Sequence, residues 1–146
     1  MTAQDIYDFL NDHELAVIAT VSSEGMPESA VIGFGQTKHL ELLFGTDNTT
    51  RKYQNLLTNP MVAVVIGWDE GRTIQYEGTA RELAANELKI VKDNYWAKAP
   101  EAEAYADYPG ERYFLVTPTW IRYTDTNTDP ETVFQFDLSN MRYKGK

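Results

Sequence analysis

Apolar and polar residues alternate along most of this chain, and short polar turns separate the alternating segments. A period of two residues is typical of β-strands. We therefore expect about six or seven strands, at residues 15–23, 28–35, 40–46, 61–68, 72–82, 112–125 and 132–136. The first and fourth of these segments are nearly continuous apolar runs, which predicts strands buried on both faces. Pro118 in the sixth segment predicts a bend or a bulge there.

Three other segments carry apolar residues at helical spacing. The first covers residues 4–12, the second follows Thr49 and Thr50, and the third repeats apolar residues from Ala84 to Tyr95. Strands joined mainly by hairpins, with a few short helices, predict a fold that is mainly β. We expect an antiparallel barrel of six to seven strands whose ends are covered by short helices.

No internal repeat, low-complexity segment or linker divides the chain, which has 146 residues. That length fits one domain with a core of its own. We therefore expect a single domain over residues 1–146, with residues 137–146 as a mobile C-terminal tail.

The composition narrows the class of function. A net charge of −9 argues against nucleic-acid binding, because phosphate contacts require a basic face. No apolar run is long enough to cross a membrane, and the N-terminus lacks the order of charges of a secretory signal. With no cysteine there is no disulfide framework, so we expect a cytoplasmic protein.

Sequence motifs exclude several kinds of active site. The chain contains no G-x-S-x-G, no H-E-x-x-H and no P-loop. Its two histidines, His13 and His39, have no partner at the spacing of metal ligands, so we expect no metal site. No residue can be named as a catalytic acid or base.

Two adjacent cations, Arg51 and Lys52, lie where the second helix should begin. Each opposes the helix dipole at a cost of about 0.3–1 kcal/mol. A bound phosphate would reverse this cost, because it would be held by helix N–H groups, a threonine hydroxyl and both cations. The alternative is that the two side chains face solvent or pair with acids such as Asp47 or Glu41. On the residues alone, both interpretations stay open.

The surrounding sequence resembles the pyridoxamine 5′-phosphate oxidase-related flavoproteins. A strand ending in "FGT" is followed by a polar loop and then by "TTRKYQNLLTNPMVAVVIGW", which matches the order of elements in that family. The stretch "HELAVIATVSSEGMPESAVIGFG" is similar to the family's first hairpin, and "GRTIQYEGTAREL" is similar to a later strand. The resemblance runs from about residue 4 to about residue 125.

This resemblance implies a split barrel that binds flavin mononucleotide (FMN) at the interface of a homodimer. Thr50, Arg51 and Lys52 resemble the loop that binds the phosphate. Thr46 would contact the flavin ring or the ribityl chain, and Thr73 falls where the family often has a glutamine that contacts the ring. The strand whose backbone lies along the isoalloxazine ring matches Val31, Ile32, Gly33 and Phe34.

The sequence also departs from the vitamin-pathway oxidase of this family. That enzyme has an arginine and a lysine at about the places of Ala30 and Gly35. We therefore expect an FMN-binding oxidoreductase that acts on an unknown small molecule and not on pyridoxamine phosphate. The alternatives are a non-catalytic carrier or sensor of flavin or haem, and a deazaflavin-dependent reductase that uses the same groove. Trp68 and Trp120 are interpreted as ordinary core or interface residues. The alternative is that Trp68 covers the flavin of a partner and that Trp120 reaches the dimer interface.

Overall fold

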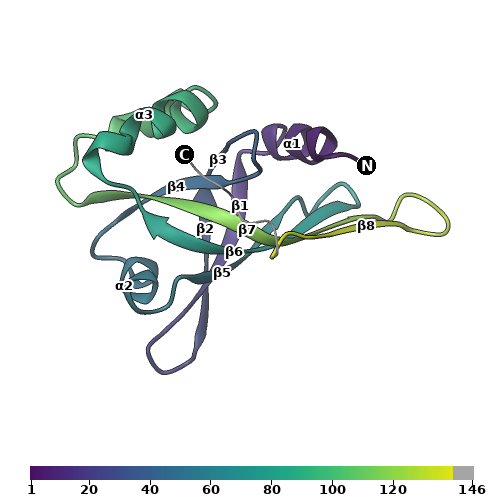
Figure 1. The fold of residues 1–146 in the computed structure, drawn as a ribbon, viewed down its shortest axis with the longest axis horizontal. Coiled ribbons are helices and arrows are strands. Elements are labelled where there is room, and N and C mark those ends of the chain that lie inside the picture. The colour runs from purple at the N-terminus through teal and green to yellow at the C-terminus, as the bar shows by residue number, and fades with distance from the viewer. Residues whose placement is uncertain (140–146) are drawn as a thin grey trace.

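Eight strands form one antiparallel sheet in residues 1–139, which are the residues that the computed structural model describes (Figure 1). The order in the sheet is β2-β1-β5-β6-β7-β4-β3, and β8 pairs with β7 beside this path. The strands are β1 (Leu15–Val21), β2 (Pro27–Gly33), β3 (Gly35–Gln36), β4 (Leu42–Asp47), β5 (Met61–Ile66), β6 (Arg72–Glu82), β7 (Glu111–Asp125) and β8 (Thr132–Asp137). The expected tail at 137–146 thus begins at the last residue of β8, and residues 140–146 lie outside the described part.

The sheet curls on itself because its two edges belong to one stretch of chain. β2 and β3 stand at opposite ends of the strand order, yet only Phe34 separates them in the sequence. The N–H of Phe34 donates to the carbonyl of Glu14 at 3.3 Å, so the stretch predicted as one strand is divided here. The result is the split barrel that the sequence predicts. Opposite Pro118, the pairing of β6 with β7 shifts register, which confirms the predicted bulge.

Alternate residues of the strands fill the barrel with a continuous apolar core. The largest buried side chains are those of Phe34, Phe44, Tyr76 and Phe114. Helix α1 (Ala3–Asn11) packs onto this core through Ile6, Phe9 and Leu10, each of which contributes about 1.5–3 kcal/mol by its burial. No helix within residues 1–139 is long and apolar enough to span a membrane.

A helical insertion, residues 84–110, lies between β6 and β7 and covers β4 and β3 (Figure 1). It contains η1 (Ala85–Glu87), α3 (Leu88–Val91), η2 (Lys92–Trp96) and η3 (Pro100–Tyr105). The stretch expected as one long helix is therefore broken into 3₁₀, α and π turns, and Leu88 is exposed. The π turn brings the neighbours Tyr95 and Trp96 to the same cluster, around the buried Leu43 of β4.

The outer face of β1, β2 and β5 is apolar and uncovered in residues 1–139. Leu15, Val31 and Met61 are exposed by 50%, 62% and 66%. The prediction that the first and fourth strands are buried on both faces is therefore wrong for the single chain. Their outward residues alternate with buried ones, because no layer of helices from residues 1–139 covers this side of the barrel.

Candidate functional site

The first turn of α2 (Arg51–Thr58) is capped by Thr50, one of the two threonines that the sequence offers for this role. The Thr50 hydroxyl accepts from the N–H of Tyr53 at 3.3 Å and donates to the carbonyl of Asp47 at 2.9 Å. The Thr46 hydroxyl lies 2.9 Å away and donates to Thr50, whose own proton is already used. Two hydroxyls thus stand beside helix N–H groups that have no partner within the helix.

Arg51 makes an ion pair with Glu28, with 2.9 Å between Nη1 and Oε2. The Arg51 side chain is 75% exposed, whereas that of Glu28 is only 16% exposed. The other oxygen of Glu28 accepts from Nδ2 of Asn55 at 2.9 Å, and the same amide nitrogen donates to Thr20. The guanidinium therefore already binds an anion at the start of the helix, and the chain itself supplies that anion.

Lys52, the next residue of the first turn, is half-buried close to Glu111 of β7. Burial lowers the pKa of Lys52, and the negative charge of Glu111 opposes that shift. Burial also raises the pKa of Glu111; the Asp47 carboxylate raises it further and Lys52 lowers it. The Lys52 ammonium and the Glu111 carboxylate therefore share a partly buried place beside the helix start, with the hydrated Asp47 carboxylate next to them.

A cavity of about 560 Å³, which we call the β4 cavity, opens next to Thr46. Its walls come from β1, β2, β4, β7 and the helical insertion, with the residues Glu14, Leu15, Gly33, Gly45, Thr46, Asp47, Tyr95, Ala99, Glu101, Ala102, Tyr105, Tyr108, Glu111 and Tyr113. Gly33 and Thr46 are the two predicted cofactor-binding residues among them. A Cβ on Gly45 would overlap the Glu111 carboxylate, so this glycine provides the room for that side chain.

The other predicted cofactor-binding residues take different places. Thr50 reaches the cavity wall through its hydrogen bond to Thr46. Val31 points away from the barrel, while Ile32 and Phe34 point into its core, so these three side chains do not line the cavity. Thr73 pairs with Thr124 in the ladder of β6 and β7 and does not line the cavity either.

Two acids of the site, Glu28 and Glu111, were not predicted. Glu28 carried a usable signal, because the alternation along 28–35 puts this acid on the same face as the buried Ile32. An acid on an apolar face predicts a buried partner. Glu111 carried no such signal, since it reaches Lys52 only through the pairing of β4 with β7. The partner of Arg51 is neither of the acids that the sequence suggested.

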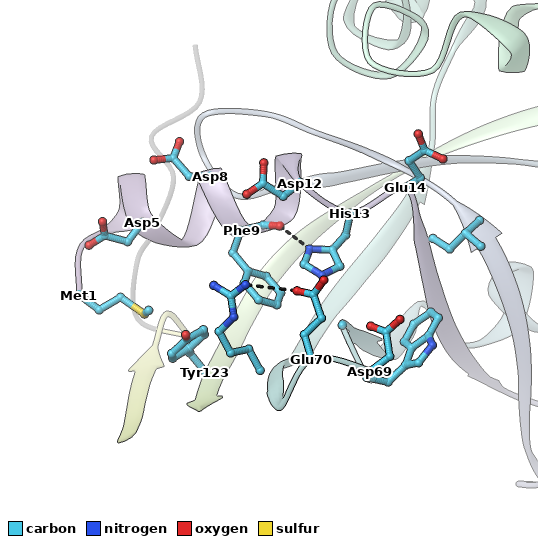
Figure 2. Close-up of a pocket in the computed structure, with 14 residues that line it drawn as sticks. Met1, Asp5, Asp8, Phe9, Asp12, His13, Glu14, Asp69, Glu70 and Tyr123 are labelled. Atoms are coloured by element: carbon cyan, nitrogen blue, oxygen red, sulfur yellow. Dashed lines mark hydrogen bonds and ion pairs between the residues drawn. The ribbon is translucent and has the colours of Figure 1, made fainter. Parts of the chain in front are cut away.

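A second cavity, of about 740 Å³, lies between α1 and the turn from β5 to β6, and we call it the α1 cavity (Figure 2). His13 stacks on Phe9 with 4.3 Å between ring centroids, and its Nδ1 lies 2.7 Å from the Phe9 carbonyl oxygen. Arg72 pairs with Glu70 at 3.2 Å. None of the predicted cofactor-binding residues lines this cavity. No cluster of three or more His, Cys, Asp or Glu residues within 1–139 is placed to hold a metal ion.

Comparison with known proteins shows which protein family the chain resembles. A family model described as pyridoxamine 5′-phosphate oxidase matches residues 2–125. A curated protein of Chromobacterium violaceum, named pyridoxine/pyridoxamine 5′-phosphate oxidase, is 30% identical over 96 residues, which are 65% of this chain and 43% of that protein. The chain spans about half the length of the curated relatives it matches.

Solved structures share the split barrel. A pyridoxamine 5′-phosphate oxidase-related, FMN-binding protein of Nostoc punctiforme has a TM-score of 0.72 and 13% identity, covering 96% of this chain and 91% of that one. A heme-binding protein from Mycobacterium smegmatis has a TM-score of 0.78 and 14% identity, covering 94% and 58%. At such identities the likeness shows the fold.

Proposed function

Because the chain belongs to the pyridoxamine 5′-phosphate oxidase family, we propose that it is a homodimeric flavoprotein that binds FMN between its two copies and serves as an oxidoreductase for a small molecule. The observation that carries this proposal is the start of α2, where Arg51 and Lys52 stand beside the hydroxyls of Thr46 and Thr50.

The phosphate of FMN fits this helix start. Two cations there cost about 0.3–1 kcal/mol each against the helix dipole, and a dianion turns the same charges into attraction. Glu28 acts as a stand-in for the phosphate, because its carboxylate lies 2.9 Å from the Arg51 guanidinium. Phosphate binding replaces this carboxylate by a doubly charged group that Lys52 attracts as well.

The flavin ring requires strands with little side-chain bulk beside it. Gly33 ends β2 and Gly45 lies in β4, and both line the β4 cavity next to Thr46. A Cβ on Gly33 would lie 3.0 Å from the Tyr95 hydroxyl, so no larger residue fits there without moving that tyrosine. We assign the backbone from Val31 to Gly33, together with Thr46, to the ring and the ribityl chain.

The uncovered outer face of the barrel supplies the surface for the second copy. Besides the exposed Leu15, Val31 and Met61, this face has a shallow cavity of about 300 Å³, lined by Val17, Ala19, Ala63, Val64, Val65, Gln75, Tyr76, Glu77 and Trp120. An apolar face of this kind marks an interface, and a two-fold axis pairs it with itself. Thr73 would then contact the flavin held mainly by the other copy.

When bound, FMN supplies the transfer of electrons or hydride. The chain itself would bind the phosphate through Arg51, Lys52 and the Thr50 hydroxyl, whose proton would turn from the Asp47 carbonyl to the phosphate, and it leaves room for the ring at Gly33. Tyrosines of the helical insertion line the β4 cavity beside the place assigned to the ring. We assign no side chain as a general acid or base.

Haem is the second candidate, because a heme-binding protein has this fold. The α1 cavity holds His13, but its wall carries six carboxylates, those of Asp5, Asp8, Asp12, Glu14, Asp69 and Glu70 (Figure 2). These charges would repel the propionates of haem. The α1 cavity is therefore a poor site for haem, whereas the cations at the start of α2 suit the phosphate of FMN. A deazaflavin remains the competitor for the same groove.

The test is a titration of the apoprotein with FMN, followed by the quenching of flavin fluorescence. Arg51→Ala/Lys52→Ala removes two charge-assisted contacts of about 1.5–3 kcal/mol each, which weakens the affinity about 100-fold or more. Lys89→Ala/Lys92→Ala removes the same charge from the helical insertion and should stay within about twofold of the unmodified protein.

Unchanged affinity of a folded Arg51→Ala/Lys52→Ala variant would overturn the phosphate assignment. Absorption spectra separate the competitors, since haem gives a Soret band. A titration with deazaflavin in place of FMN shows which of these two cofactors the protein binds more tightly.

A further inference from the structure

The β4 cavity extends beyond the residues that we assign to FMN. Its far wall belongs to the helical insertion over β4 (Figure 1), which contributes Tyr95, Ala99, Glu101, Ala102, Tyr105 and Tyr108. At about 560 Å³ the cavity has the size of a small-molecule site. The insertion thus encloses space next to Gly33 and Thr46 that a second ligand can enter.

Four tyrosines give this space aromatic walls. The rings of Tyr105 and Tyr108 stand edge to face, with centroids 5.6 Å apart, and the two residues are 54% and 57% exposed. Tyr95 and Tyr113 are buried deeper, at 8% and 7% exposure. Such walls suit a flat, unsaturated ring, and a ring that carries positive charge gains further from the tyrosine faces.

Acidic side chains set the charge of the cavity. Its lining includes the acids Glu14, Asp47, Glu101 and Glu111. No lysine or arginine is among the lining residues. Thr49 donates two hydrogen bonds to Asp47, which lowers the pKa of that carboxyl and keeps it ionised. Lys52, outside the lining, offsets part of the charge of Glu111. A negatively charged group deep in this cavity, away from Arg51 and Lys52, would be repelled, and a cation would be attracted.

One buried polar group in this wall lacks a partner. Within residues 1–139, the Tyr113 hydroxyl makes no hydrogen bond, and neither does Nε1 of Trp96, whose ring packs edge-on at 5.8 Å. Burial raises the pKa of Tyr113 and the indole N–H of Trp96 lowers it, so the two groups interact although neither meets the geometric criteria of a hydrogen bond. A buried hydroxyl in this state gains from a polar atom of a ligand.

We propose that the β4 cavity is the substrate site and that it takes a planar aromatic molecule with a positive charge. This inference rests on the FMN site proposed above and adds the class of its substrate. The tyrosines pack on the ring and the carboxylates attract the charge. A polar substituent that reaches the buried Tyr113 hydroxyl gives it the partner it lacks within residues 1–139. The same carboxylates disfavour a phosphate ester such as the one in the names of the curated relatives.

Three pyridine derivatives of similar size test this charge preference: 1-methylnicotinamide is a cation, nicotinamide is neutral and nicotinate is an anion. Their affinities for the FMN-loaded protein are measured by calorimetry. The cation should bind about tenfold or more tighter than the anion, with nicotinamide between them. Equal or tighter binding of nicotinate, or no binding of any of the three, would overturn the inference.

Variants separate this inference from the FMN site. Glu101→Gln should reduce the preference for the cation by about threefold or more, whereas Glu131→Gln, in an exposed loop, should leave it unchanged. Tyr113→Phe breaks no hydrogen bond that the structure shows within residues 1–139, so a loss of nicotinamide affinity by about two- to tenfold reports a contact with the ligand. If the protein binds FMN but shows no charge preference, only the substrate class fails; if FMN does not bind, the proposed function fails.

Discussion

Replacing Gly35 with alanine should destabilise the protein strongly. Gly35 begins β3, and a Cβ on it would lie 2.5 Å from the carbonyl oxygen of Asn94 and 2.5 Å from Cα of Tyr95. Both atoms belong to the main chain of η2, so no rotation of a side chain relieves the overlap. The helical insertion must therefore move away from the barrel.

The loss of stability can be worked out from the contacts that are weakened when the insertion moves. Overpacking costs about 1–3 kcal/mol where side chains can yield, and more where backbone meets backbone. Val91 and Tyr95, which are 0% and 8% exposed, lose part of their burial, worth about 1.5–3 kcal/mol per side chain. We expect a loss of about 3–5 kcal/mol in the free energy of unfolding and a decrease in Tm of about 6–20 °C.

Urea unfolding followed by tryptophan fluorescence measures this loss, and Trp96 reports on the insertion itself. Gly25→Ala is the matched control, because Gly25 has a φ of +81° and a Cβ there would meet nothing within 4 Å. That variant loses only the about 1–2 kcal/mol that a residue with a side chain costs in the left-handed conformation. A Gly35→Ala protein as stable as Gly25→Ala would show that the insertion does not approach β3 this closely.

Two further predictions concern the interface and a buried lysine. Val31→Glu should convert the proposed dimer to monomer in analytical ultracentrifugation, whereas Val133→Glu on β8 should not; a dimeric Val31→Glu protein would contradict the interface. Lys98 donates to the Leu10 carbonyl and the Gln36 amide oxygen at 3.0 and 2.8 Å, and burial lowers its pKa from 10.5 to about 8. The unfolded chain therefore binds more protons between these values, so stability should rise with pH in that window. Urea midpoints at pH about 7.5 and 9.5 should show a smaller rise in Lys98→Met, and an equal rise would refute the assignment.

Local patterns predicted the parts of the fold that local interactions determine. Alternation located the strands, since each has one face in the barrel core, and the cap at Thr50 was visible because capping involves only neighbours. The burial of Leu43 was not predictable in this way, because it depends on the distant helical insertion. The prediction that the outer face of β1 is buried was wrong for a related reason. Periodicity does not reveal whether another layer covers Leu15.

The residues of the candidate site likewise fall into those that local sequence predicts and those that depend on the fold. The helix start with Arg51 and Lys52 could be read from adjacent residues, whereas Glu28 and Glu111 come from other strands and depend on the topology. Resemblance supplied the placement of Gly33 and Thr46, which the β4 cavity brings together. It did not supply the tyrosines of the insertion, whose position depends on the fold of residues 84–110.

The ion pair between Glu28 and Arg51 makes the chain its own competitor for anions. A tethered carboxylate keeps a constant effective concentration, whatever the solution contains. Singly charged ions such as chloride or acetate bring no more charge than Glu28 and gain little by displacing it. A dianion such as the phosphate of the proposed FMN would gain more from Arg51 and Lys52 than Glu28 does, so this carboxylate would favour doubly charged ligands over singly charged ones.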